Sequence, residues 1–250
     1  MVQSPKIGIT MRLENPTRRF YLGRDYSEAL ENFGAVPLHI SLIPKKNYIR
    51  GLLEGLDGLL LPGSDSDVDP DYYGEEPHQN LKNVVPVKDE TEFLVLEEAE
   101  RTGLPILAIC YGMQALNVWR GGSLVQDIST QLKKAVKHEQ GIPLERNSHG
   151  LRTEKGSLIS GLITKKDCRV NSHHHQAVAR IGRFLKATAW AKDGVVECIE
   201  DTRKDRFVFG VQWHPELSWR TDDLSGKIFE LFVEETRKRA FKRRKRNCQN

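Results

Sequence analysis

The hydrophobic pattern of the first quarter of the chain alternates between short apolar runs and stretches with helical spacing. Apolar runs at residues 6–10, 36–40 and 58–61 are typical of buried strands, and apolar residues recur at helical spacing over 21–33 and 48–53. This alternation predicts an α/β fold with three layers, in which helices flank a mostly parallel central sheet. Functional side chains are then expected beyond the carboxyl ends of the strands.

The second half of the chain is less regular and predicts some antiparallel strands. Strand-like runs occur at residues 168–170, 185–190 and 195–199, and the turn sequence Lys192-Asp-Gly194 joins the last two. We therefore expect a hairpin that adds antiparallel strands to the sheet. Residues 224–241 begin as an amphipathic helix and run into a basic segment.

Length and charge fit one domain with a basic tail. We assign residues 1–236 of the 250-residue chain to a single domain. The formal net charge of +4 includes eight basic residues between positions 237 and 246, so the remainder carries 4 − 8 = −4. We expect the tail, residues 237–250, to extend the last helix or to be disordered. Nucleic-acid binding through this tail is the non-enzymatic alternative, and the lack of an aromatic stacking set beside it argues against that role.

The remaining composition limits the cellular setting. No apolar run approaches the roughly 20 residues that span a bilayer, and no hydrophobic signal core precedes the first strand. We expect a cytoplasmic protein with no membrane partner. The four cysteines show no C-x-x-C spacing, which indicates neither a zinc site nor a disulfide framework.

The hydrophobic period changes at Cys110. The apolar run through Ile109 is typical of a buried strand, whereas helical spacing begins at Tyr111. Cys110 is therefore expected on a tight turn from strand to helix, where the backbone N–H groups that open the helix favour a thiolate. A buried structural cysteine is the alternative.

A candidate general base follows the apolar run at residues 207–209. On an extended chain, side chains two positions apart point to the same side, so His214 and Glu216 can share a face. A histidine that is oriented by a carboxylate is the base that a cysteine nucleophile needs. Cys110, His214 and Glu216 therefore form a candidate catalytic set.

Four segments carry a resemblance to a known family. They are Leu61-Pro-Gly-Ser64, Ala108-Ile-Cys-Tyr-Gly-Met-Gln114, Asn171-Ser-His-His-His-Gln-Ala177 and Gly210-Val-Gln-Trp-His-Pro-Glu216. In this order they resemble the class I glutamine amidotransferases, and more narrowly the γ-glutamyl-γ-aminobutyrate hydrolases of peptidase family C26. The resemblance extends from about residue 6 to about residue 233 and implies the flavodoxin-like form of the predicted α/β fold.

The resemblance also implies roles for further residues. It implies that the backbone N–H groups of Gly63 and Tyr111 form an oxyanion hole. It further implies that the γ-glutamyl group is bound by Gln114, Ser172, His173, His174, His175 and Gln176.

The run His173–His175 also raises a metal hypothesis, because imidazole is a common metal ligand. Consecutive side chains of an extended chain point in alternating directions, so these three do not easily converge on one ion. We therefore expect no metal site. His138 and His149 show no carboxylate that would converge on them, and we interpret both as structural or peripheral.

Two segments before Cys110 allow weaker predictions. Residues 72–87 lack periodicity and are expected to form an irregular loop, a candidate lid over the site. Asp89 and Glu92 have the spacing of a helix cap, with contact to substrate or to a neighbouring protomer as the alternative for Glu92. Lys88 stands where the resembled family usually has arginine.

The resemblance and the candidate residues together imply a cysteine-dependent hydrolase of γ-glutamyl amides. The reaction would pass through a γ-glutamyl thioester on Cys110 and would need no cofactor. A glutaminase subunit with a separate synthetase partner and a poly-γ-glutamyl hydrolase are the enzymatic alternatives. No synthetase-like segment follows Val233, which favours the free-standing hydrolase. Association into a homo-oligomer stays open, and so does the identity of the leaving amine.

Overall fold

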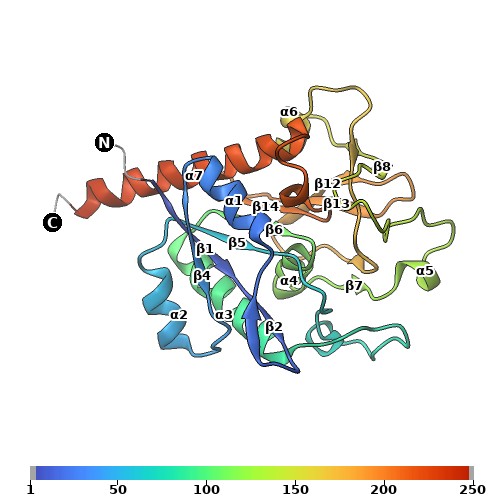
Figure 1. Cartoon of the computed structure of the whole chain (residues 1–250), viewed down its shortest axis with the longest axis horizontal. Helices are drawn as coiled ribbons and strands as arrows, with labels where there is room; N and C mark the ends of the chain where they lie inside the picture. The colour runs from blue at the N-terminus through green and yellow to red at the C-terminus, as the bar shows by residue number, and fades with distance from the viewer. Residues whose placement is uncertain (1–3, 248–250) are drawn as a thin grey trace.

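The computed structural model describes residues 4–247, and an eight-stranded sheet lies at the centre of this part of the chain (Figure 1). Its strand order is β4-β1-β5-β6-β14-β13-β12-β9. In that order the strands are Val36–Ile40, Lys6–Thr10, Gly58–Leu61, Ile106–Ile109, Val208–Val211, Val196–Asp201, Leu185–Trp190 and Arg152–Thr153. The five strands from β4 to β14 are parallel and the rest pair antiparallel, which confirms the predicted mixed α/β sheet.

The remaining elements cover the sheet and line its carboxyl edge. The helices are α1 Arg24–Asn32, α2 Lys46–Leu53, α3 Pro86–Thr102, α4 Tyr111–Trp119, α5 Ile128–Gln131, α6 Leu158–Leu162 and α7 Asp223–Asn247, with 3-10 turns η1 Pro70–Tyr73 and η2 Pro215–Leu217. The short strands are β2 Arg12–Glu14 with β3 Arg19–Tyr21, β7 Leu124–Val125 with β11 Ala177–Val178, and β8 His149–Gly150 with β10 Arg169–Val170.

The core lies on both faces of the sheet, because neighbouring residues of a strand point to opposite sides. In β5, Leu59 and Leu61 join the apolar cluster formed with α2, α3 and α4, whereas Leu60 joins the cluster formed with α1 and α7. Figure 1 shows these two helical layers, with the long α7 crossing one face. None of the described helices is both long enough and apolar enough to cross a bilayer.

The first helix begins later than its apolar spacing predicted. Tyr21 was expected at its start but ends β3, where it pairs with Arg12 in a hairpin. The helix begins at Arg24 and ends at Asn32, one residue before the predicted end, and Gly34 just beyond it has a φ of 84°, a conformation that costs glycine little. The short hairpin thus takes precedence over the helical pattern.

The basic segment continues the last helix. α7 extends through residues 237–247, while residues 248–250 of the predicted tail lie outside the described residues. Arg243 forms an ion pair with the buried Asp57, with Nη2 and Oδ1 2.9 Å apart, and donates to the carbonyl of Glu54. At least this part of the basic segment therefore packs against the domain.

The helix-cap interpretation of Asp89 and Glu92 is wrong. α3 begins at Pro86, three residues before Asp89, so both acidic residues lie within the helix. Glu92 is fully buried and accepts hydrogen bonds of 2.6 Å from Lys88 Nζ and from the Thr10 hydroxyl. Lys88 is equally buried, and its Nζ lies 4.5 Å from the centre of the Tyr111 ring. The pair thus connects α3 to β1 and to the start of α4.

We predict that Lys88→Met lowers the free energy of unfolding by about 3–5 kcal/mol, because it leaves the buried Glu92 carboxylate without its cation. Chemical denaturation measures the change. Lys46→Met is the matched control, since Lys46 pairs with Glu97 on the exposed surface and should change stability by less than about 1 kcal/mol. Equal losses in the two variants would contradict the role assigned to the buried pair.

Candidate active site

Three neighbouring parallel strands bring the predicted site residues to one edge of the sheet. Cys110 directly follows β6, and His214 follows β14 after a short turn. The register aligns Ile109 with Val211, and the Cys110 N–H donates to the Val211 carbonyl at 2.8 Å. Because the strands are parallel, the segments that follow them emerge side by side.

The turn at Cys110 has a strained backbone, and the start of α4 beside it packs closely on β5. Cys110 has φ 52° and ψ −109°, a conformation that costs a non-glycine residue about 1–3 kcal/mol. Gly112 permits the close packing of α4 on β5, because an added Cβ would lie 2.3 Å from the Leu61 carbonyl oxygen. The prediction of a tight strand-to-helix turn is therefore confirmed, and Cys110 lines a pocket of about 520 Å³ while 4% of its surface is exposed.

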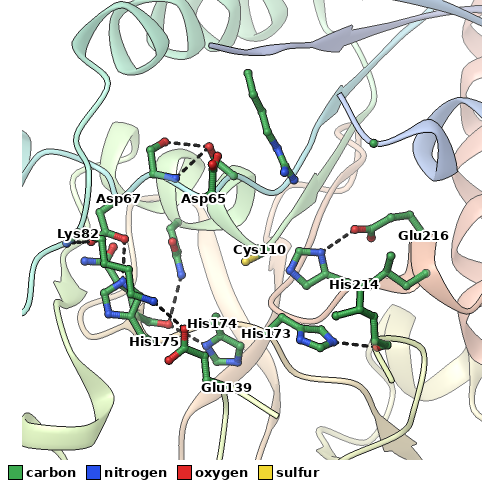
Figure 2. Close-up of a pocket in the computed structure, with 18 of the residues that line it drawn as sticks. Asp65, Asp67, Lys82, Cys110, Glu139, His173, His174, His175, His214 and Glu216 are labelled. Carbon is green, nitrogen blue, oxygen red and sulfur yellow. Dashed lines mark hydrogen bonds and ion pairs between the residues drawn. The ribbon is translucent and has the colours of Figure 1, made fainter. Parts of the chain in front are cut away.

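His214 lies between the cysteine and Glu216. Figure 2 shows the sulfur of Cys110 facing the His214 imidazole, whose other side contacts Glu216. The distance from His214 Nδ1 to Glu216 Oε1 is 2.6 Å. A carboxylate only accepts, so Nδ1 carries a proton and Nε2 is left for the thiol.

The predicted reason for this contact is wrong, although the contact exists. His214 and Glu216 do not share a face of an extended chain, because the 3-10 turn η2 begins at Pro215. The backbone of His214 is held instead by the Asn171 side chain, which accepts from its N–H and donates to its carbonyl, both at 2.8 Å.

Electrostatics favour a protonated His214. Burial alone would lower the pKa of this imidazole, but the charges of Glu216 and Cys110 and hydrogen bonds to both raise it to about 10. An imidazolium at neutral pH is the partner that stabilises a thiolate.

The two predicted oxyanion-hole donors differ in availability. Tyr111 is the first residue of α4, so its N–H has no acceptor within the helix, and its hydroxyl is anchored by Asp89. The Gly63 N–H donates to the Tyr26 hydroxyl at 3.0 Å. Glycine is also needed at position 63 to leave space for His214, because an added Cβ would lie 2.7 Å from His214 Cε1.

Two residues beside this set were not predicted from the sequence. Tyr26 lies in the stretch 21–33 that was predicted only to form a helix, yet it lines the pocket, and burial followed by the charge of Glu216 raises its pKa well above the usual range. Arg12, which also lines the pocket, donates from Nε to the Gly63 carbonyl at 2.7 Å. Neither residue lies in one of the four motifs. Arg12 on β2 and Tyr26 on α1 come close to the other site residues only in the folded chain.

Five of the six predicted substrate contacts line the pocket. They are Gln114, His173, His174, His175 and Gln176. Ser172 does not, because it is fully buried with its hydroxyl 3.3 Å from His138 Nδ1, so the structure does not support it as a substrate contact.

The three consecutive histidines point to different partners, as the alternation argument expects. His173 Nε2 contacts the Leu144 carbonyl at 2.8 Å and His175 Nε2 contacts Asp67 at 2.8 Å. His174 instead turns inward toward the buried Glu197.

The expectation that no carboxylate converges on His138 and His149 is wrong. Both are buried, and with His174 they surround Glu197. The ligand atoms of His138, His174 and Glu197 all lie within 4.8 Å of one another, close enough to consider a metal ion.

Charged residues from loops form the other end of the pocket. Figure 2 shows Asp65, Asp67, Lys82 and His175 on the side away from Glu216. Lys82 comes from the irregular loop between η1 and α3, which is shorter than the predicted loop at residues 72–87. Its Nζ lies 2.6 Å from Glu139. Asp65 and Asp67 lie in the loop that follows β5.

Comparison with known proteins shows the family of this chain. The family model described as peptidase C26 matches residues 5–216. A Lactococcus lactis protein assigned as glutamine amidotransferase-like, YvdE, is 36% identical over 86% of this chain and 89% of its own length. The γ-glutamyl-γ-aminobutyrate hydrolase PuuD of Escherichia coli is 32% identical over 93% of this chain and 94% of its own.

A solved structure shares the fold at lower sequence identity. A Thermoplasma acidophilum protein assigned as one subunit of GMP synthase superposes with a TM-score of 0.64 and 18% identity, over 98% of each chain. At this identity the likeness shows the fold alone.

We predict that Glu216→Gln moves the pKa of His214 from about 10 toward its ordinary value of 6.5, because it removes the first of the charges that raise it. ¹⁵N NMR of the ring nitrogens measures the midpoint. Since the folded-state pKa is raised, the associated stability is fully present below about pH 6.5 and is lost as the pH rises through about 10. The wild-type advantage in Tm should therefore shrink over that interval. The same titration midpoint for His214 in wild type and in Glu216→Gln would contradict the conclusion that Glu216 raises this pKa.

Proposed function

We propose that this chain, which belongs to the peptidase C26 family, hydrolyses γ-glutamyl amides with Cys110 as the nucleophile. The observation that carries the proposal is the alignment of Cys110, His214 and Glu216 along one wall of a pocket. A thiol, an imidazole and a carboxylate in this order are the parts that nucleophilic acyl transfer needs. The 32% identity to a hydrolase of this type over nearly its whole length supports the same reaction class.

In the first half of the reaction, the Cys110 thiolate attacks the γ-carbonyl carbon of the bound amide. The negative charge on the carbonyl oxygen is stabilised by the Tyr111 N–H, and by the Gly63 N–H if the Tyr26 hydroxyl releases it. The His214 imidazolium then gives its Nε2 proton to the leaving nitrogen as the C–N bond breaks. An amine departs and a γ-glutamyl thioester remains on Cys110.

In the second half, neutral His214 takes a proton from water as the water oxygen attacks the thioester carbonyl. The C–S bond breaks, glutamate leaves, and Cys110 and His214 return to the thiolate–imidazolium pair. Glu216 keeps the proton on Nδ1 and the ring in place throughout, so that Nε2 always faces the sulfur.

The geometry of Gln114 suits the amino end of the γ-glutamyl group. Its Nε2 donates to the Gln176 carbonyl at 3.2 Å and to Gln212 Oε1 at 3.1 Å, which uses both of its N–H groups. The amide oxygen remains as an acceptor for an α-ammonium group. Arg12 supplies a cation in the same pocket for the α-carboxylate.

We predict that Cys110→Ala lowers the turnover of a γ-glutamyl amide by about 1,000-fold or more, since loss of a nucleophile removes the covalent route. Release of glutamate measures the rate, and circular dichroism checks the fold. Cys168→Ser is the matched control, because this half-buried cysteine lies outside the pocket and the rate should stay near wild type. Undiminished hydrolysis by Cys110→Ala would overturn the nucleophile assignment.

A substrate panel tests the reaction class. The purified chain should release glutamate from γ-glutamyl amides of small amines, among them γ-glutamyl-γ-aminobutyrate, faster than from glutamine. A preference for glutamine would favour a glutaminase instead. Cleavage restricted to γ-glutamyl chains of several residues would favour a poly-γ-glutamyl hydrolase.

A further inference from the structure

A cluster of four buried ionisable side chains lies behind one wall of the pocket. Three imidazole nitrogens surround one oxygen of Glu197: His149 Nε2 at 3.2 Å, His138 Nδ1 at 3.5 Å and His174 Nε2 at 3.8 Å. Glu197 is completely buried on β13, and neither of its oxygens has a hydrogen-bond partner among the described residues. A buried carboxylate without donors is costly, so this site requires a positive charge.

The outer contact of His174 fixes which of its nitrogens can bind a cation. Its Nδ1 lies 2.8 Å from the Gln176 carbonyl, which can only accept, so the proton sits on Nδ1. A neutral His174 then directs the lone pair of Nε2 toward Glu197. Nε2 is buried and has no hydrogen-bond partner within residues 4–247.

His138 is arranged in the same way. Its Nε2 lies 2.9 Å from Asp193 Oδ2, so the proton sits on Nε2 and the lone pair of Nδ1 faces Glu197. The Ser172 hydroxyl can donate to this lone pair but leaves the Glu197 carboxylate without a donor. Acceptors thus face an acceptor, an arrangement that a cation between them would stabilise.

The spacing at His138 and His174 is wider than a shared proton allows. A proton would draw nitrogen and oxygen to roughly 2.7–3.2 Å. The contact of His149 at 3.2 Å falls in this range, whereas His138 and His174 stand farther from Glu197, so a proton shared with His149 leaves these two imidazoles without a cation. Around a tetrahedral zinc ion with bonds of about 2.0–2.1 Å, neighbouring ligand atoms lie about 3.4 Å apart. The Asp193 carboxylate behind His138 is the outer partner that metal-binding histidines usually have.

We propose that His138, His174 and Glu197 bind a divalent transition-metal ion of the zinc class, with His149 as the fourth side chain of the site. Two or three imidazoles with one carboxylate form a ligand set that suits such an ion. A second pocket, lined in part by Lys137, His138 and His174, offers a route for the ion.

The position of the site indicates a structural role. The ion would lie beside the segment at residues 171–176, which carries Asn171 at one end and Gln176 at the other. Asn171 holds the His214 backbone, and Gln176 contacts Gln114. The ion would hold this segment against β13. This structural role does not depend on the reaction proposed for Cys110.

The experiment measures metal in the untagged full chain carrying Cys110→Ala, since a thiolate beside an imidazole can itself bind zinc. Metal content is determined by mass spectrometry, followed by titration of chelator-treated protein with Zn²⁺. We expect about one equivalent of zinc, a higher Tm on addition of Zn²⁺, and visible absorption bands of a tetrahedral site with Co²⁺.

Variants locate the ion within the chain. Glu197→Gln should weaken Zn²⁺ binding at least as much as the about 10- to 100-fold loss known for changes around metal ligands, and His138→Asn serves if that variant does not fold. His173→Gln is the control and should bind normally, because His173 contacts Leu144 instead. Failure of chelator-treated Cys110→Ala protein to bind Zn²⁺ or Co²⁺ would overturn the proposal in favour of a proton, and undiminished binding by Glu197→Gln would overturn the ligand assignment.

Discussion

The parallel pairing of β6 with β5 and β14 is the constraint on which the site depends. It places the segments after three strands at one edge, so Gly63, Cys110 and His214 meet although they are far apart in sequence. The cost is a strained backbone at Cys110, which is held by its hydrogen bond to Val211 and by the packing of Gly112 on β5. Most of the geometry therefore belongs to the sheet.

Buried charge is the second organising feature, and it surrounds the proposed site. Lys88 and Glu92 form an ion pair beneath the start of α4, while Glu216 orients His214 at the end of β14. Three imidazoles surround the Glu197 carboxylate behind the pocket wall. A buried charge without a partner destabilises a fold. Each of these contacts therefore favours the one arrangement of the chain in which the charged side chains are paired. The segment at residues 171–176 links two of them, since Asn171 holds His214 and His174 faces Glu197.

Local patterns predicted the sheet and the turn at Cys110, because buried strands and tight turns leave their signal in neighbouring residues. The parallel strands at residues 6–10, 36–40 and 58–61 have the predicted bounds. Contacts between distant segments left no such signal. The wrong explanation for the contact of His214 with Glu216 arose because spacing along an extended chain cannot predict η2. Tyr26 and Arg12 reach the pocket only through the packing of α1 and the β2 hairpin.

The histidines also show that local patterns do not predict contacts between distant segments. Alternation correctly separated the side chains of His173, His174 and His175, but it could not predict what each would meet. His138, His149 and Glu197 come from separate parts of the chain, and no short motif joins them.

The proposed reaction requires that the Cys110 sulfur form a covalent bond with the γ-glutamyl group. Acid quenching of wild-type protein during turnover of a γ-glutamyl amide, followed by peptide mass spectrometry, tests it most directly. We expect a γ-glutamyl adduct on the peptide that contains Cys110, which is lost on treatment with hydroxylamine and is absent from Cys110→Ala. Rapid turnover with the adduct on another residue, or product formation by Cys110→Ala, would contradict it.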